Sequence, residues 1–473
     1  MADSAGFESA IGVIAISACL GAVILAIFVF VSLRNNSQDE NSASDSKEKR
    51  EKSKEKPQNG TKSAKGKKRN QSQGVMNHRR QFAALKGHTS EVLDLDFSLN
   101  GKLLASTSQD RTVRLWSVKD FKEKEHKYVR ANVDFDHATK VNFSPDSSED
   151  IAQQQQQQQP LRFRAFITAL ANGNTIRVFK VSKKKDGTGT TITGEFDFPV
   201  RHKAEIINIA VASNGKYIMS CSKDTTIIIW DLKGEVLATL DTLQINNSFS
   251  ALSPCGRFVA SAGFTPDVKL WEVKFNKSDA FEQVSRAMEL KGHTAGIYHF
   301  SFSADSKRMA TVSKDSTWRV WDIDESNEPV CLVSVVEYTK QQDPALLMTG
   351  IYDASCNMYD NMLISISPDA YVTAISMGRC IALFNTENGN LEELLQDVHG
   401  DTITAIAWHP SSRYLASAGG SDRQIRVWHN AAGIKVQIDD LKGKLVRAKS
   451  DTIRGRIEQQ ILEASASLDE LNV

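Results

Sequence analysis

The segment Gly292–Asp322, GHTAGIYHFSFSADSKRMATVSKDSTWRVWD, decides the fold because its spacing recurs along the chain. Within it, Trp321 follows His293 by 28 positions, and Asp315 lies between them. Recurrence of one interval indicates an internal repeat of roughly 40 residues, which identifies a repeat architecture rather than several unrelated domains. The same intervals separate His88, Asp110 and Trp116, and His202, Asp224 and Trp230.

Seven units with one common pattern follow residue 80. Each has an entry loop, a strand ending in Phe or Trp, a Ser-Pro or Asn-Gly turn, a second strand, an Asp turn and a third strand ending in Trp or Phe. Period-two strands between turn signals predict antiparallel blades. The second unit is interrupted by the glutamine run 153–159, the fourth lacks the His, and the sixth is degenerate.

These units resemble WD40 repeats, with Trp-Asp pairs at Trp230-Asp231 and Trp321-Asp322. The resemblance implies an all-β fold, a seven-bladed β-propeller over residues 79–432, with the insert 147–160 in a hairpin loop of the second blade. In the family, a His, a strand Ser or Thr, an Asp and a Trp form a hydrogen-bonded tetrad inside a blade. Buried polar groups need partners, so we expect these residues to be structural rather than catalytic or metal-binding. The matching positions are His88, Ser106, Asp110 and Trp116; His202, Ser220, Asp224 and Trp230; His293, Thr311, Asp315 and Trp321; and His399, Asp422 and Trp428.

Ring closure should depend on the segment RRQFAAL, residues 79–85, just before Gly87-His88. A propeller must cover the open edge of its last blade. We therefore expect this segment to pair with QIRVW, residues 424–428, of the seventh unit.

The N-terminal region predicts a membrane anchor. Residues 11–31 carry no charge, and a helix over 11–33 is long enough to cross a bilayer. Lys and Arg outnumber Asp and Glu by eight between Arg34 and Arg80, so the positive-inside rule puts residues 1–10 in the lumen and the propeller in the cytosol. A cleaved signal peptide is the alternative. Residues 34–78 cannot bury enough apolar surface to fold, and read as a basic tether.

The C-terminal residues 436–473 predict a helical tail. Ile457, Ile461, Ala464, Leu468 and Leu471 follow 4, 3, 4, 3 spacing, which indicates an amphipathic helix. Packing back on the propeller and dimerisation both remain open for its apolar face.

Four stretches narrow the resemblance to an endoplasmic-reticulum branch of the WD40 family: ANVDFDHATKVNFSPD, LANGNTIRVFK, SPCGRFVASAGFTPDVKLWEV and QQDPALLMTG. This resemblance implies a single-pass protein of the endoplasmic reticulum membrane. Its cytosolic propeller would bind the cytosolic domain of the stress-activated kinase of the unfolded-protein response, and would act in translational control. The basic tether is a candidate contact for anionic lipid, the ribosome or mRNA.

No catalytic motif is present, so we expect a scaffold rather than an enzyme, without cofactor or metal. The alternatives are a nucleotide-exchange regulator of a small GTPase, a ubiquitin-ligase substrate receptor, for which the expected Trp-Asp-x-Arg is missing, and an RNA-associated adaptor. The candidate partner-binding residues lie beside the tetrad Asp positions or at loop starts: Glu91, Gln109, Glu205, Lys223, Phe264 and Lys314.

Overall fold

The computed structural model describes residues 78–123, 125–145, 165–183, 190–324, 344–352 and 362–472. The expected membrane helix 11–33, nearly all of the tether 34–78 and the glutamine insert lie outside these ranges. Within them, no helix is long and apolar enough to cross a membrane.

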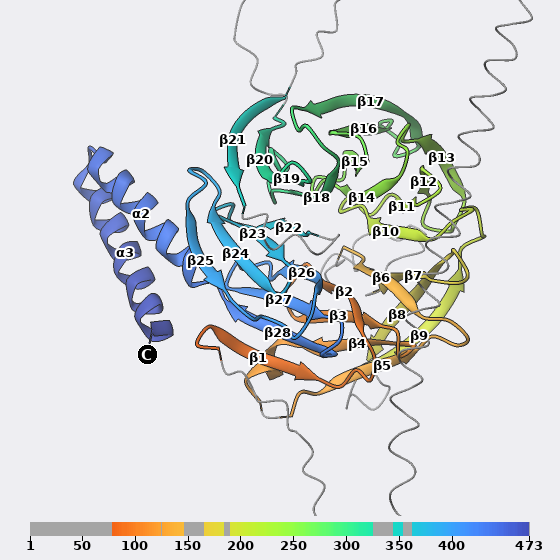
Figure 1. Ribbon diagram of the computed structural model, residues 1–473, viewed down its shortest axis with the longest axis horizontal. Coiled ribbons are helices and arrows are strands. Elements are labelled where there is room, and N and C mark those ends of the chain that lie inside the picture. Colours follow the sequence, from red (N-terminus) through yellow and green to blue (C-terminus); the bar gives the residue numbers. More distant parts are fainter. Residues whose placement is uncertain are drawn as a thin grey trace, which may run out of the picture. The chain divides into compact units, whose positions relative to one another are not determined.

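The described strands form seven four-stranded antiparallel sheets, arranged as the blades of a propeller (Figure 1). Blade 1 is β2 (Val92–Phe97), β3 (Leu103–Ser108), β4 (Thr112–Ser117) and β5 (Tyr128–Asn132), with a 3-10 turn η1 (Val118–Lys122) after β4. Blade 2 is β6 (Ala138–Phe143), β7 (Ala165–Leu170), β8 (Ile176–Lys183) and β9 (Thr190–Asp197). Blade 3 is β10 (Ile206–Val211), β11 (Ile218–Ser222), β12 (Thr226–Trp230) and β13 (Val236–Asp241).

The other blades repeat this order, and the fold class expected from the repeats is confirmed. Blade 4 is β14 (Asn247–Leu252), β15 (Phe258–Gly263), β16 (Asp267–Phe275) and β17 (Phe281–Lys291). Blade 5 is β18 (Ile297–Phe302), β19 (Arg308–Ser313), β20 (Thr317–Asp322) and β21 (Ala345–Ile351). Blade 6 is β22 (Ile364–Ile366), β23 (Val372–Met377), β24 (Cys380–Asn385) and β25 (Leu391–Leu395). Blade 7 is β26 (Ile403–Trp408), β27 (Tyr414–Gly419), β28 (Gln424–His429) and β1 (Gln81–Lys86).

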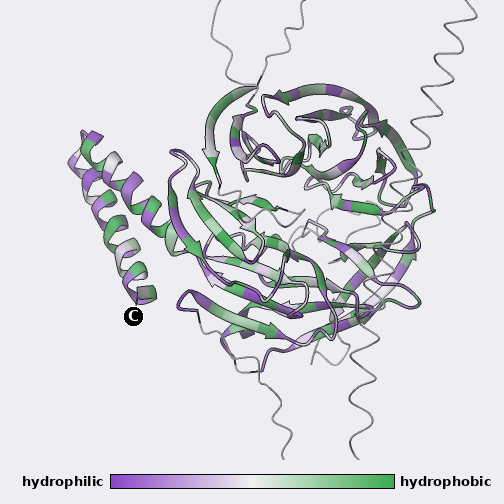
Figure 2. Ribbon diagram, in the orientation of Figure 1, coloured by the Kyte–Doolittle hydropathy of each residue, from purple (hydrophilic) through white to green (hydrophobic). Residues whose placement is uncertain are grey.

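Burial follows the position of a strand within its blade. Second and third strands such as β11 and β12 are almost wholly buried, and TIIIW in β12 supplies the β-branched side chains that pack well there. Fourth strands such as β13 are largely exposed. Figure 2 shows the apolar colour following the strands of the ring. The hydrophobic core therefore lies between neighbouring blades.

Strand β1 closes the ring, as expected. It pairs antiparallel with β28 from Gln81↔Trp428 to Lys86↔Gln424. The Phe82 ring stacks on Tyr414 at 4.6 Å between centroids. The outermost strand of blade 7 thus comes from the start of the repeat region, which joins the two ends of the fold.

The C-terminal tail is a pair of helices, α2 (Ala431–Arg447) and α3 (Asp451–Asn472), rather than the single amphipathic helix expected. The chain leaves helical geometry at Ala448, whose ψ is 125°. The Ser450 carbonyl then accepts a hydrogen bond from Arg454 N, which starts α3. Helix α2 packs against the propeller through Ala432 and Val436, and α3 packs on α2. The predicted apolar stripe of α3 is half-buried, not fully exposed.

Candidate functional site

The polar network of blade 1 is a relay of hydrogen bonds. His88 Nδ1 lies 2.9 Å from Asp110 Oδ2, and His88 Nε2 lies 2.8 Å from Ser106 Oγ. Trp116 Nε1 donates to Ser106 Oγ at 2.9 Å. A neutral imidazole satisfies every group if Nδ1–H donates to Asp110 and the Ser106 hydroxyl donates to Nε2. The relay ties the loop before the inner strand to the second and third strands.

Blades 3, 5 and 7 contain the same relay. His202 Nε2 lies 2.7 Å from Ser220 Oγ, and His293 Nε2 lies 2.7 Å from Thr311 Oγ1. His399 Nε2 lies 2.8 Å from Ser417 Oγ, which also accepts the Trp428 indole N–H. Ser417 was not among the expected residues, although its separation of 18 from His399 equals that between His88 and Ser106. The corresponding Nδ1 contacts reach Asp315 at 2.9 Å and Asp422 at 2.7 Å. In blade 3, His202 Nδ1 lies nearer to Thr226 Oγ1, at 3.1 Å, than to Asp224 Oδ2, at 3.5 Å.

In the tetrads of blades 1, 3 and 5, burial favours the neutral form of the His, and hydrogen bonds favour the charged form of the Asp. Burial lowers the pKa of His88, His202 and His293, although the neighbouring Asp partly opposes this effect. Burial tends to raise the pKa of Asp315, but hydrogen bonds from Thr317, the Thr294 backbone amide and His293 outweigh it and lower this pKa to about 2. A carboxylate held by this many donors is not free to act as a general base.

Each tetrad Asp also shapes the turn that follows it. Asp110 Oδ1 accepts the Thr112 backbone N–H at 3.0 Å, and Arg111 between them has a left-handed φ of 61°. An Asx-type bond of this kind stabilises a conformation that residues other than glycine seldom adopt. The same left-handed residue follows the Asp in the other tetrad blades: Thr225, Ser316 and Arg423.

Blade 4 keeps the Ser and Trp positions of the tetrad, Ser261 and Trp271, but lacks its His, its Asp and the left-handed turn residue. Aligned by strand register, Leu243 stands at the His position, Thr265 at the Asp position and Pro266 at the left-handed position. Proline locks φ near −65°, so the tetrad turn cannot form there. The Ser261 hydroxyl, at the position of Ser106, is buried, and none of the described residues hydrogen-bonds to it.

A different network replaces the tetrad in blade 4. The buried Lys269 ammonium donates to the carbonyls of Thr242 at 2.9 Å and Leu243 at 3.1 Å. Thr242 Oγ1 donates to Asn247 Oδ1, and Asn247 Nδ2 donates to the Ser222 carbonyl of blade 3. The loop 242–247 is therefore held by Lys269 and by its own Thr242 and Asn247 side chains, whereas the side chains of Leu243 and Ile245 take no part in this network.

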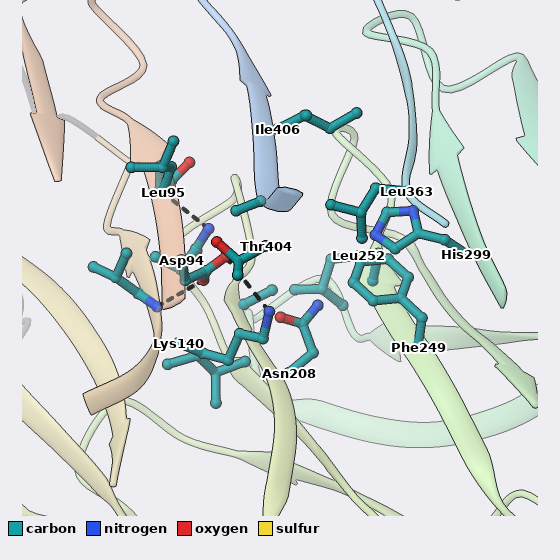
Figure 3. A pocket seen from close by; sticks show the side chains of 17 residues that line it. Asp94, Leu95, Lys140, Asn208, Phe249, Leu252, His299, Leu363, Thr404 and Ile406 are labelled. Atoms are coloured by element: carbon teal, nitrogen blue, oxygen red, sulfur yellow. Dashed lines mark hydrogen bonds and ion pairs between the residues drawn. The ribbon is translucent and has the colours of Figure 1, made fainter. Parts of the chain in front are cut away.

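The inner strands line a central channel whose polar residues the sequence analysis did not single out. Asp94 Oδ2 accepts the Val141 N–H at 3.0 Å, and Asp94 Oδ1 lies 3.5 Å from Lys140 Nζ (Figure 3). Asp96 Oδ2 accepts the Phe143 N–H at 2.7 Å. The alternation in VLDLDF puts both carboxylates on one face of β2, which was the available signal.

These contacts belong to a set of side-chain hydrogen bonds that join each inner strand to the next. Every one of the seven pairs of neighbouring inner strands has at least one such bond to a backbone group. Donor and acceptor are Thr404 Oγ1 and Val92 O, Val141 N and Asp94, Val211 N and Asn142 Oδ1, Asn208 Nδ2 and Ser250 O, Ser248 Oγ and Ile297 O, Ile364 N and His299 Nδ1, and Trp408 Nε1 and Ser365 O.

Burial controls the charge of the channel. It raises the pKa of Asp96 to about 8, with a further increase from Asp94 and an opposing effect of the Phe143 N–H. Burial and then Lys140 lower the pKa of His299 to about 3, and Phe249 stacks on its ring at 3.7 Å. Figure 3 shows this stack across the channel from Asp94. Near neutral pH the channel thus holds a neutral His299 and a largely protonated Asp96.

We define the tetrad face as the loops before the inner strands together with the turns between second and third strands. At its centre a cavity of about 430 Å³ opens into the channel, between the first residues of the inner strands. Lys140, Phe249, Tyr298 and Thr404 contribute to its lining. Among the described residues, no group of three His, Cys, Asp or Glu side chains could hold a metal ion.

The six candidate partner-binding residues lie on the tetrad face but do not form one cluster. Gln109, Lys223, Phe264 and Lys314 occupy the same turn position in blades 1, 3, 4 and 5, as their backbone N–H bonds to Glu91, Glu205, Asn246 and Gly296 show. Two pairs bridge within a blade: Gln109 donates to Glu91 at 3.0 Å, and Lys223 donates to Glu205 at 2.6 Å. Phe264 is 63% exposed, and Lys314 Nζ lies over the Tyr298 ring.

The fold and its tetrads define the class of protein: a WD-repeat β-propeller. The WD40 model "WD domain, G-beta repeat" matches residues 79–117, 197–231, 285–322 and 392–429, the regions of the four tetrad blades. Human transducin beta-like protein 2 is 47% identical over 394 residues, covering 83% of this chain and 81% of its own. The mouse protein is 46% identical, covering 88% and 89%. An Arabidopsis thaliana relative, pre-mRNA-processing factor 19 homolog 2, is 24% identical over half of this chain and 40% of its own. The chain belongs to the family of transducin beta-like protein 2.

Proposed function

We propose that this protein is a membrane-tethered scaffold whose propeller presents the tetrad face to protein partners. The proposal rests on one observation: on the tetrad face, the side chains that hold the blades together differ from those that are exposed to solvent. The His and Asp side chains of the tetrads are occupied in holding blades together, whereas large apolar side chains of neighbouring loops are exposed to solvent. A rigid frame with exposed apolar loops suits binding rather than catalysis.

The proposed membrane location, orientation and partners of this scaffold rest on the sequence. The uncharged residues 11–31 and the basic segment after them support an anchor in the endoplasmic reticulum membrane, with the propeller in the cytosol. The resemblance to transducin beta-like protein 2 supports a role in the unfolded-protein response and translational control, with the cytosolic domain of the stress kinase as partner. The basic tether would add salt-sensitive contacts to the ribosome or mRNA.

Protease protection of intact microsomes tests the orientation. The propeller should be digested from outside, and the sequons at Asn246 and Asn276, both exposed in the fold, should carry no glycan. A protected, glycosylated propeller would place it in the lumen and refute binding to cytosolic partners.

Purification of the full chain with the cytosolic kinase domain tests the scaffold itself. The kinase domain should bind the full chain. It should not bind a chain that consists of residues 1–75 and therefore lacks the propeller. Equal binding by both chains would assign the interaction to the N-terminal region and refute a propeller scaffold.

A further inference from the structure

Blade 4 exposes three large apolar side chains together on the tetrad face. Leu243 is 69% exposed, Ile245 77% and Phe264 63%. The first two lie in the loop 242–246, and Phe264 lies in the turn beside it, since Phe264 N donates to the Asn246 carbonyl at 3.1 Å. We call these three residues the blade-4 cluster. Exposed apolar groups that lie together mark interaction sites more often than scattered ones do.

The loop holds this exposure in a fixed conformation. Leu243 has a left-handed φ of 52°, a conformation that costs a non-glycine residue energy unless its surroundings impose it. The Leu243 N–H donates to Asp241 Oδ1 at 2.8 Å, and Lys269 binds the Leu243 carbonyl from below. The next residue, Gln244, is buried, and its Oε1 accepts a hydrogen bond from the Thr265 hydroxyl at 2.9 Å. Alternate residues therefore point inward, and Leu243 and Ile245 point outward.

The charges around the cluster are mostly positive. In the loops and turns of the tetrad face in blades 3 to 5, together with the last residue of the strand before each loop, five exposed residues are basic and two, Asp197 and Asp241, are acidic. Two of the basic residues already have an acidic partner: Lys223 donates to Glu205 at 2.6 Å, and Lys291 Nζ lies 3.0 Å from Glu289 Oε2. The other carboxylates of these loops are half-buried; Asp224, for example, accepts the Lys203 N–H. The five exposed basic residues are Arg201, Lys203, Lys223, Lys291 and Lys314.

We propose that the blade-4 cluster docks a partner segment that carries two or three apolar side chains flanked by Asp or Glu. The apolar residues would cover Leu243, Ile245 and Phe264, and the carboxylates would meet the surrounding ammonium and guanidinium groups. Two of the three cluster residues are aliphatic and cannot stack on bases, which favours a peptide over single-stranded nucleic acid. This inference rests on the proposed scaffold function and names the partner chemistry for one site on the tetrad face.

Fluorescence anisotropy with the purified full chain tests this docking site. The probes are three short synthetic peptides: one alternating Leu or Phe with Asp or Glu, the same peptide with Lys replacing the acids, and the same peptide with Ala replacing the apolar residues. The acidic–apolar peptide should bind, and the other two should bind at least about tenfold more weakly.

Variants then locate the site. The triple variant L243N/I245S/F264S should weaken binding of the acidic–apolar peptide at least about tenfold, because the contact area is lost. Asn is suited to the left-handed position 243, so the melting temperature should stay unchanged. Leu99→Ser is the matched control, since Leu99 is 65% exposed in a turn between first and second strands, away from the tetrad face. The variant K291E/K314E should weaken the acidic peptide and strengthen the Lys peptide.

Three results would overturn the docking site: no binding of the acidic–apolar peptide up to about 1 mM, equal binding by the folded triple variant, or equal affinity for the acidic and Lys peptides. A labelled single-stranded RNA that binds in place of the peptide, and is released by K291E/K314E but not by the triple variant, would assign the face to nucleic acid. If the kinase domain still binds the triple variant while the peptide does not, the scaffold function stands and the partner docks through other residues.

Discussion

Ser106 and Ser261 occupy equivalent positions in two blades but have different surroundings. Ser106 Oγ is bonded to both His88 and Trp116, whereas Ser261 Oγ is buried with no partner in the part of the chain that the structure describes. Ser106→Ala should lower the free energy of unfolding by about 1–3 kcal/mol, because it leaves two buried polar groups unsatisfied. Ser261→Ala, the matched control, should change it far less. Chemical denaturation of both variants measures the difference, and similar losses would show that the relay contributes nothing to stability.

The channel carboxylate Asp96 should make stability depend on pH. Its pKa in the fold is raised to about 8, well above the ordinary Asp value. Its contribution is therefore fully present below the ordinary value and is lost as pH rises through about 8, since only the unfolded state ionises freely between these limits. Asp96→Asn keeps an acceptor for the Phe143 N–H but cannot ionise.

We therefore expect the melting temperature of the parent chain to fall between pH 6.5 and pH 9 by more than that of Asp96→Asn. Thermal melts of both chains at the two pH values provide the measurement. His88, His202 and His293 do not confound it, since their lowered pKa values affect stability on the acid side. Parallel decreases in the two chains would refute a raised pKa for Asp96.

At the scale of the element, the repeat interval predicts blades well because it reflects local contacts. His293 and Trp321 are 28 positions apart because both must reach Thr311, and any chain that builds the relay must keep that spacing. The Asp94–Lys140 pair was missed for the opposite reason. These residues meet only when blades 1 and 2 stand side by side, and no period within one unit records that.

The two other differences are also local. In blade 4, the strand pattern survives without His and Asp because Lys269 replaces their contacts, which no tetrad motif records. In the tail, the break between α2 and α3 falls at Ala448–Ser450, where neither Gly nor Pro marks a helix end. The spacing of Ile457 to Leu471 describes α3 correctly but carries no information about where α2 ends.

The closing strand β1 should contribute strongly to stability. Leu85 is only 1% exposed and packs in the core between blades 7 and 1. Leu85→Ala should lower the free energy of unfolding by about 2–5 kcal/mol, as for other buried large-to-small changes. Loosening β1 also uncovers the edge of β28, so the variant should self-associate near its melting temperature. Lys86→Ala, at the exposed neighbouring position, is the control. Light scattering during a thermal ramp measures self-association. Equal scattering by Leu85→Ala and Lys86→Ala would contradict a role of β1 in covering the edge of β28.

At the scale of the whole molecule, side-chain to backbone hydrogen bonds join each inner strand to the next. No junction between neighbouring blades of the described ring lacks such a bond. Each blade is connected to both neighbours through backbone groups of the channel strands. Strand β1, which runs on along the chain into blade 1, completes blade 7 through its hydrogen bonds to β28. Loss of one blade would leave two sets of core residues and two strands of the channel exposed. The repeats should therefore unfold together, unlike an open solenoid in which each repeat contacts only its neighbours.

Thr404→Val tests this cooperativity at one junction. Thr404 Oγ1 donates to Val92 O across the boundary between blades 7 and 1, and its loss should cost about 1 kcal/mol. In a cooperative ring, that cost lowers the protection of amides in every blade by the same free energy, including blade 4 on a distant part of the ring. Hydrogen exchange under mildly destabilising conditions, read blade by blade, measures it. Thr139→Val, which removes a bond to Ala169 O inside blade 2, is the matched control for a hydroxyl lost within one blade. Exchange that increases only in blades 7 and 1 of the Thr404 variant would show that the blades unfold separately, and would refute a rigid frame for the tetrad face.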